Sequence, residues 1–84
     1  MKIKLTEEEL VERLGARDAA AFEYLYDNYS GALYGSILRM VQDENVAQDL
    51  LQETFVKIWK NYSSYNSDRG RLYTWMVNIA RNLA

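Results

Sequence analysis

The 84-residue chain contains no cysteine, no histidine and no proline. Without cysteine there is no disulfide framework, and without cysteine or histidine there are no thiolate or imidazole ligands for zinc. The same absences exclude nucleophiles that depend on a histidine base and the Glu-x-x-His pairs of di-iron bundles. We therefore expect no metal, no cofactor and no enzymatic activity. The absence of proline leaves long helices uninterrupted.

The chain also lacks any long apolar run. No segment approaches the roughly 18 consecutive apolar residues of a membrane span, and the first residues, Met1 to Glu9, lack the apolar stretch of a signal peptide. We therefore expect a soluble, cytoplasmic protein without a membrane partner. A chain of this size hides only about 60% of its unfolded surface. With 49% apolar residues, one domain with a small core is feasible.

Charge is distributed unevenly along the chain. Residues 1–56 carry eleven acidic and five basic residues, a formal charge of −6, whereas residues 57–84 carry one acidic and five basic residues, a formal charge of +4. Such asymmetry is typical of a protein with two surfaces that face different partners. A short chain also reaches it by chance, and the charge alone does not separate these interpretations.

Local signals predict two helices in the first half. Thr6 and Glu9 match a capping box for a short helix that ends near Gly15 and buries Leu10 and Leu14. Asp18 is the predicted N-cap of a much longer second helix. Its apolar positions follow the helical period: Phe22, Leu25, Tyr26, Tyr29, Leu33, Ile37 and Met40. On its opposite side, two glycines, Gly31 and Gly35, either permit a close backbone approach or are merely tolerated, and we favour toleration.

The second half predicts two further helices. Residues 42–45 break the helical pattern and offer caps for a third helix that runs to about Tyr62. Its predicted core positions are Val46, Ala47, Leu50, Leu51, Phe55, Ile58 and Trp59. After a polar stretch, residues 63–70, the fourth helix is expected to bury Leu72, Met76, Ile79, Ala80 and Leu83. The predicted fold is an all-α bundle of about four helices, forming one domain over residues 1–84.

The face of the third helix opposite its apolar stripe combines acidic, amide and apolar side chains. At about 100° per residue, this face carries Asp49, Gln52, Glu53, Val56 and Lys60. Asp49 and Glu53 are like charges four residues apart, an arrangement that slightly disfavours an isolated helix. A basic partner helix would fit such a face, with Val56 as an apolar contact. The alternative is an ordinary solvated face, and geometry alone slightly favours it.

The last third of the chain combines basic, amide and aromatic side chains. One side of the fourth helix carries Arg71, Thr74, Trp75, Asn78, Arg81 and Asn82. Arginine attracts phosphate, and asparagine can make paired hydrogen bonds to a base edge. Tyr65, Tyr73 and Trp75 offer flat surfaces for unstacked bases, with Tyr73 clearly off the apolar stripe. Trp75 lies at the border of that stripe, so core packing and contact with DNA are equally compatible with its position.

Three segments resemble one protein family in order and spacing. Asn45 to Trp59 closely resembles the second characteristic segment of sigma factors of the extracytoplasmic-function class, with the motif residues Ala47, Asp49, Leu50, Gln52, Glu53, Phe55 and Trp59. Residues 20–29 are similar to the opening helix of that family, and residues 73–82 resemble its DNA-facing helix. Almost the whole chain from Leu10 onward is covered.

The resemblance implies a sigma-factor region 2 domain and assigns roles to both surfaces. The third helix would bind the clamp helices of the largest subunit of RNA polymerase through Asp49, Gln52, Glu53 and Val56. The loop over residues 67–72, which includes Asp68, would accept a flipped base from the non-template strand of the promoter −10 element. The residues expected to contact DNA are Lys57, Lys60, Tyr65, Arg69, Arg71, Tyr73, Thr74, Trp75, Asn78, Arg81 and Asn82.

The expected function is therefore transcription initiation without covalent chemistry. The domain would bind core RNA polymerase, recognise the −10 element and melt it by capturing non-template bases. By the same resemblance, an anti-sigma protein is a possible further partner, and the helix-turn-helix region 4 domain of the family is absent from this chain. The alternative function is a protein-only helical interaction module. The sequence does not identify the promoter motif, the regulon or the inducing signal.

Overall fold

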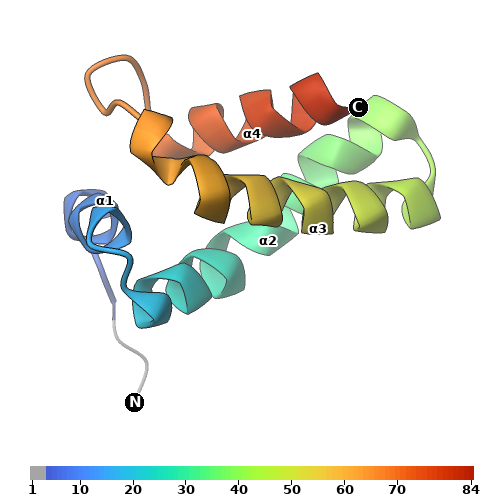
Figure 1. The fold of residues 1–84 in the computed structure, drawn as a ribbon. Helices are drawn as coiled ribbons and strands as arrows, with labels where there is room; N and C mark the ends of the chain where they lie inside the picture. The colour runs from blue at the N-terminus through green and yellow to red at the C-terminus, as the bar shows by residue number, and fades with distance from the viewer. Residues whose placement is uncertain (1–3) are drawn as a thin grey trace.

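The computed structural model describes residues 4–84, which form four α-helices and one short 3-10 helix. The elements are α1 (Glu7–Gly15), α2 (Ala19–Val41), α3 (Glu44–Asn61), η1 (Tyr62–Ser64) and α4 (Leu72–Leu83). Figure 1 shows α2, α3 and α4 packed together, with α1 at the end of the bundle where α2 begins and α3 ends. No residue from 4 to 84 lies in a strand. The predicted all-α bundle of four helices is confirmed.

Side-chain caps begin the first three helices where the sequence predicts them. The Thr6 hydroxyl accepts from the Glu9 amide, and the Glu9 carboxylate accepts from the Thr6 amide, each at 3.1 Å. These hydrogen bonds lower the pKa of Glu9 below its ordinary value. Asp18 and Asp43 cap α2 and α3 by accepting from backbone amides at 2.9 and 3.1 Å. In contrast, Arg71 precedes α4 without making any side-chain cap.

The link between α1 and α2 turns at Arg17. Helix α1 ends at Gly15 as predicted, but the left-handed residue is Arg17, with φ of 60°. That conformation is uncommon outside glycine. The Arg17 guanidinium lies 4.1 Å from the centroid of the Trp59 ring and donates a hydrogen bond to the Trp59 carbonyl. Arg17 thus fastens the link to the last turn of α3.

The core lies between α2, α3 and α4, with α1 closing one end. Its fully buried large side chains are Leu10, Leu14, Leu25, Leu33, Ile37, Thr54, Ile58, Leu72 and Met76. Two predicted core residues are exposed instead, Tyr26 at 43% and Val46 at 48%. Each follows or precedes a fully buried residue, and one step along a helix turns the side chain by about 100°. The neighbouring helices cover only one side of α2 and α3, so these two side chains reach solvent.

Several other predicted core positions lie at the edge of the core. Six of them are only partly buried: Phe22, Tyr29, Met40, Trp59, Ile79 and Leu83. Thr54, which the apolar pattern omits, is fully buried and donates to the Leu50 carbonyl at 2.7 Å. The hydrogen bond satisfies its hydroxyl and makes the burial of a polar group tolerable. A Cβ at Gly31 would meet no atom within 4 Å, which confirms that this glycine is merely tolerated.

Candidate protein-docking and nucleic-acid surfaces

The exposed face of α3 forms one wall of a groove. Asp49, Gln52, Glu53 and Val56 are all exposed, as predicted, and Val56 is 52% exposed. They line a groove of about 570 Å³ that also includes Lys57, Lys60 and Asn61 of α3, and Leu83 from the end of α4. The arrangement offers carboxylates, an amide and an apolar side chain together. Such a mixed surface suits a partner helix that carries both cationic and apolar side chains.

An apolar groove lies directly beside this face. Phe22 and Tyr26 of α2 and Phe55, Val56 and Trp59 of α3 line a hollow of about 750 Å³. Tyr26 packs on Phe55 with ring centroids 4.9 Å apart, and Phe22 lies at the same distance from Trp59. Because Val56 and Gln52 line both grooves, the polar and apolar surfaces are continuous. Accessible aromatic side chains beside polar ones are typical of protein interfaces, and here Tyr26 is exposed while Phe22 and Trp59 are partly buried.

This groove is not predicted by the sequence pattern, because the helical period places Tyr26 and Trp59 in the core. The available signal was that the apolar stripe of α2 is broad: Phe22 and Tyr26 lie about 100° from Ala21 and Leu25, which form its buried centre. When the apolar stripe of a helix is wider than the surface that one neighbouring helix covers, the edge of that stripe stays exposed.

The basic side of α4 is solvent-exposed. Arg71, Thr74, Asn78, Arg81 and Asn82 are all exposed, as expected for side chains that contact a partner. Arg81 donates to the Asn78 carboxamide at 3.1 Å, so these two side chains are held together on one face. A smaller pocket of about 240 Å³ lies between α3 and α4, lined by Lys57, Asn61, Ser64, Trp75, Ile79, Asn82 and Leu83. It brings Lys57 together with two predicted DNA-contacting residues of α4.

Tyr73 does not lie off the apolar stripe, and that prediction is wrong. Its ring is half-buried against the core, with its centroid 6.5 Å from that of Tyr29. Its hydroxyl donates to the Ala32 carbonyl at 3.0 Å and lies 2.7 Å from the Ser36 hydroxyl. These hydrogen bonds to α2 hold the Tyr73 ring against the core, because the hydroxyl of a partly buried tyrosine usually finds a partner. The free surface that Tyr73 offers a base is correspondingly reduced.

Trp75 and Tyr65 form an aromatic cluster where η1 meets α4. Their ring centroids are 5.2 Å apart, and Tyr62 meets the Trp75 ring edge-to-face at 5.7 Å. Trp75 is half-buried, so it packs inward and keeps part of its ring accessible. Its packing on the core is thus confirmed, whereas its contact with DNA stays a prediction. Burial is the main cause that raises the pKa of Tyr65 above its ordinary value and that of Tyr62 to about 12.

The loop between η1 and α4 is held by short-range hydrogen bonds. The Tyr65 hydroxyl donates to the Gly70 carbonyl at 3.0 Å, and Asn66 accepts from the Asp68 and Arg69 amides at 2.9 and 3.0 Å. Arg69 and Asp68 remain exposed. These bonds close the loop into a compact turn that presents its charged side chains to solvent.

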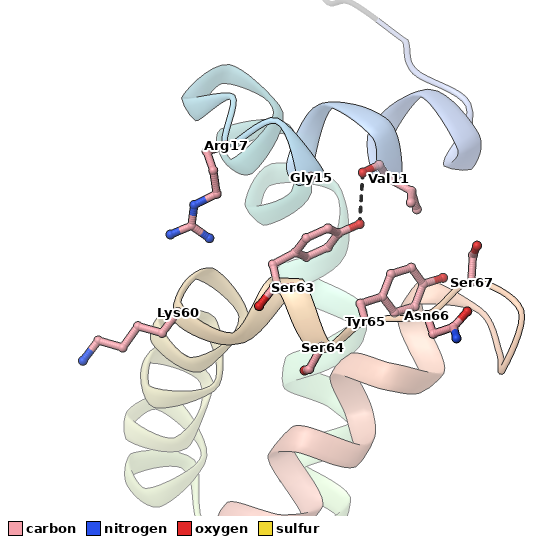
Figure 2. Close-up of a pocket in the computed structure, with 10 residues that line it drawn as sticks. Val11, Gly15, Arg17, Lys60, Ser63, Ser64, Tyr65, Asn66 and Ser67 are labelled. Carbon is pink, nitrogen blue, oxygen red and sulfur yellow. Dashed lines mark hydrogen bonds between the residues drawn. The ribbon is translucent and has the colours of Figure 1, made fainter.

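A further groove lies between α1 and η1 (Figure 2). It has a volume of about 730 Å³ and is crossed by the hydrogen bond from the Tyr62 hydroxyl to the Val11 carbonyl, 3.1 Å long. Arg17 and Lys60 lie at one end, and Tyr65, Asn66 and Ser67 lie at the other. Lys60 therefore borders two grooves, this one and the α3 groove of about 570 Å³ that it shares with Lys57.

The described part of the chain shows neither a metal-type cluster nor a membrane span. Across residues 4–84, no three acidic side chains are grouped as a cation would require. Within the same residues, no helix combines the length and hydropathy needed to cross a bilayer.

Comparisons with known proteins give a consistent result. Residues 25–84 match the protein family described as Sigma-70 region 2. The chain is 37% identical over 78 residues to the RNA polymerase sigma-H factor of Pseudomonas aeruginosa, which covers 93% of this chain and 40% of that protein. It is 29% identical over 75 residues to the ECF RNA polymerase sigma factor SigK of Mycobacterium bovis, covering 89% and 40%. The chain thus spans about two fifths of the length of these curated relatives.

Proposed function

The chain belongs to the Sigma-70 region 2 family, and on this premise we propose that it docks on core RNA polymerase and opens promoter DNA. The docking surface is the α3 face of Asp49, Gln52, Glu53 and Val56, and its partner is the pair of clamp helices of the largest polymerase subunit. The DNA surface is the basic side of α4 with the preceding loop. It captures non-template bases of the −10 element.

One observation carries this proposal: the family match coincides with two exposed surfaces of different chemistry on adjacent helices. The α3 face is acidic and apolar, whereas the loop and α4 carry three arginines, Arg69, Arg71 and Arg81, that are all exposed. A polymerase helix and a DNA strand can therefore be bound at the same time. The curated relatives are named as RNA polymerase sigma factors, which is the activity proposed for this chain.

Strand capture needs no catalytic residue. Extruding a base costs a few kcal/mol, and each base that stacks on an aromatic ring regains about 1–3 kcal/mol. Trp75 and Tyr65 are the best-placed rings, because both are only partly buried and pack on each other, and Tyr65 shares a groove with the exposed Arg69 and Arg71. Tyr73 contributes less, since its hydroxyl is engaged by α2. One or two stacked bases together with phosphate contacts are enough to favour the opened strand.

Docking is tested by measuring binding to core RNA polymerase. Gln52→Ala and Glu53→Ala are each expected to weaken binding about tenfold or more, because truncating a central polar contact leaves its partner unpaired. Glu44→Ala is the matched control, since Glu44 is exposed on the same helix about 180° around from Glu53. Equal binding by all three variants would contradict docking through α3. Helicity measured by circular dichroism confirms that each variant is folded.

Strand binding is tested with a labelled single-stranded oligonucleotide at about 50 and about 200 mM salt. Arg81→Gln is expected to weaken binding and to reduce the dependence on salt, because each phosphate contact contributes about 0.7 to the logarithmic slope for single strands. Arg13→Gln on α1 carries the same charge change at an exposed position away from α4. If salt has no effect and Arg81→Gln behaves as Arg13→Gln does, the chain is a protein-only interaction module. By resemblance to other members of the family, an anti-sigma protein would bind over these same surfaces of α3 and α4.

A further inference from the structure

A carboxylate from α1 contacts the start of α4. Glu7 Oε1 lies 3.3 Å from Nη2 of Arg71, and Glu7 Oε2 accepts from the Leu72 amide at 3.4 Å. These partners are 64 and 65 residues away in the sequence. Leu72 is the first residue of α4, and Arg71 provides no side-chain cap of its own. Glu7 therefore supplies the acceptor that α4 lacks and holds the loop arginine in place.

The contact lies inside a groove whose two walls carry opposite charge. Glu7, Glu8 and Glu12 of α1 form one wall, and the loop forms the other with Tyr65, Ser67, Asp68, Arg69, Gly70 and Arg71, enclosing about 730 Å³. The Glu7 side chain is 33% exposed, whereas the Arg71 side chain is 82% exposed. A phosphate of a bound strand can therefore reach the Arg71 guanidinium from solvent. Carboxylate and phosphate oxygens accept from the same guanidinium donors, so they compete for them.

We propose that Glu7 regulates strand binding: it holds Arg71 while the DNA surface is empty and releases it to a phosphate when a strand binds. The inference rests on the strand-binding part of the proposed function. Glu7 acts through Arg71 and is thus a positioning residue. By holding Arg71, the Glu7 carboxylate keeps the loop ordered before a strand binds. Its negative charge also repels any anion that does not take its place on Arg71.

The test is a double-mutant cycle between Glu7 and Arg71 on the 84-residue chain. A short, labelled single-stranded oligonucleotide of randomised sequence is titrated by fluorescence anisotropy against wild type, Glu7→Gln, Arg71→Gln and the double variant. Glutamine keeps an oxygen that accepts from the Leu72 amide but loses the charge that pairs with Arg71. Glu7→Gln is expected to bind about two- to fivefold more tightly, because an exposed ion pair is weak. Its logarithmic salt slope is expected to steepen by up to about 0.7, since one more cation is free to contact a phosphate.

Glu8→Gln is the matched control, because Glu8 lines the same groove but has no hydrogen bond or ion pair with the loop among residues 4–84. If Glu7 acts through Arg71, the gain from Glu7→Gln disappears in the Arg71→Gln background and exceeds the gain from Glu8→Gln. A gain that persists without Arg71, or that Glu8→Gln reproduces, would overturn the inference and leave strand binding intact. Weaker binding by Glu7→Gln would show that Glu7 is only a scaffold. No salt-dependent binding by any variant would overturn both the inference and strand binding.

Discussion

The hydroxyl of Tyr62 joins η1 to α1 and provides a quantitative test of the packing. Its side chain is 7% exposed, and the hydroxyl donates to the Val11 carbonyl at 3.1 Å across 51 residues of sequence. Tyr62→Phe removes this hydrogen bond and keeps the ring that packs on Tyr65 and Trp75. At neutral pH the expected loss of unfolding free energy is about 1 kcal/mol, the usual net contribution of a neutral hydrogen bond.

The same residue makes stability depend on alkaline pH. Burial, with a smaller contribution from Tyr65, raises the pKa of Tyr62 from 10.0 to about 12 in the folded protein. A raised folded pKa means that the protonated form is favoured by folding, so its contribution is complete below pH 10 and is lost as the pH rises through 12. At about 1.36 kcal/mol per pH unit, the loss amounts to roughly 2–3 kcal/mol. Phenylalanine has no ionisable proton, so the Tyr62→Phe variant does not lose this part of its unfolding free energy at high pH.

The assay is urea unfolding followed by circular dichroism between pH 8 and pH 12. Wild type is expected to exceed Tyr62→Phe by about 1 kcal/mol at pH 8 and to fall to its level or below near pH 12. Tyr34→Phe is the matched control, because Tyr34 is half-buried on α2 and its side chain makes no hydrogen bond among residues 4–84. If wild type and Tyr62→Phe lose stability in parallel between pH 10 and pH 12, the reasoning is refuted.

Three further substitutions test the helices and the docking face. Gly31→Ala is expected to stabilise the domain by about 0.5–1 kcal/mol, because its Cβ enters open space; thermal unfolding measures this, and destabilisation would contradict it. Leu33→Ala is expected to cost about 2–5 kcal/mol, since Leu33 is fully buried, and a denaturant midpoint close to wild type would argue against the described core. Val56→Lys should change stability by no more than about 0.5 kcal/mol yet weaken polymerase binding, and unaffected binding would remove Val56 from the interface.

The candidate surfaces were predictable to different extents. The α3 face was found from the sequence because Asp49 to Val56 lie on one helix, where spacing alone places side chains on a common side. The exposed side of α4 was found for the same reason. The apolar groove beside α3 was missed, because it needs Phe22 and Tyr26 of another helix. The spacing of residues along one helix does not show which neighbouring helix packs against the edge of its apolar stripe.

The sequence by itself determined the local elements of this protein. Thr6, Asp18 and Asp43 cap helices through hydrogen bonds that span two or three residues, and the helical period marks the buried stripes. Only the tertiary structure decided that Tyr73 turns its hydroxyl toward α2 and that Glu7 caps α4 and pairs with Arg71. These contacts join residues 41 or more positions apart, so they depend on how the helices pack and not on any local pattern.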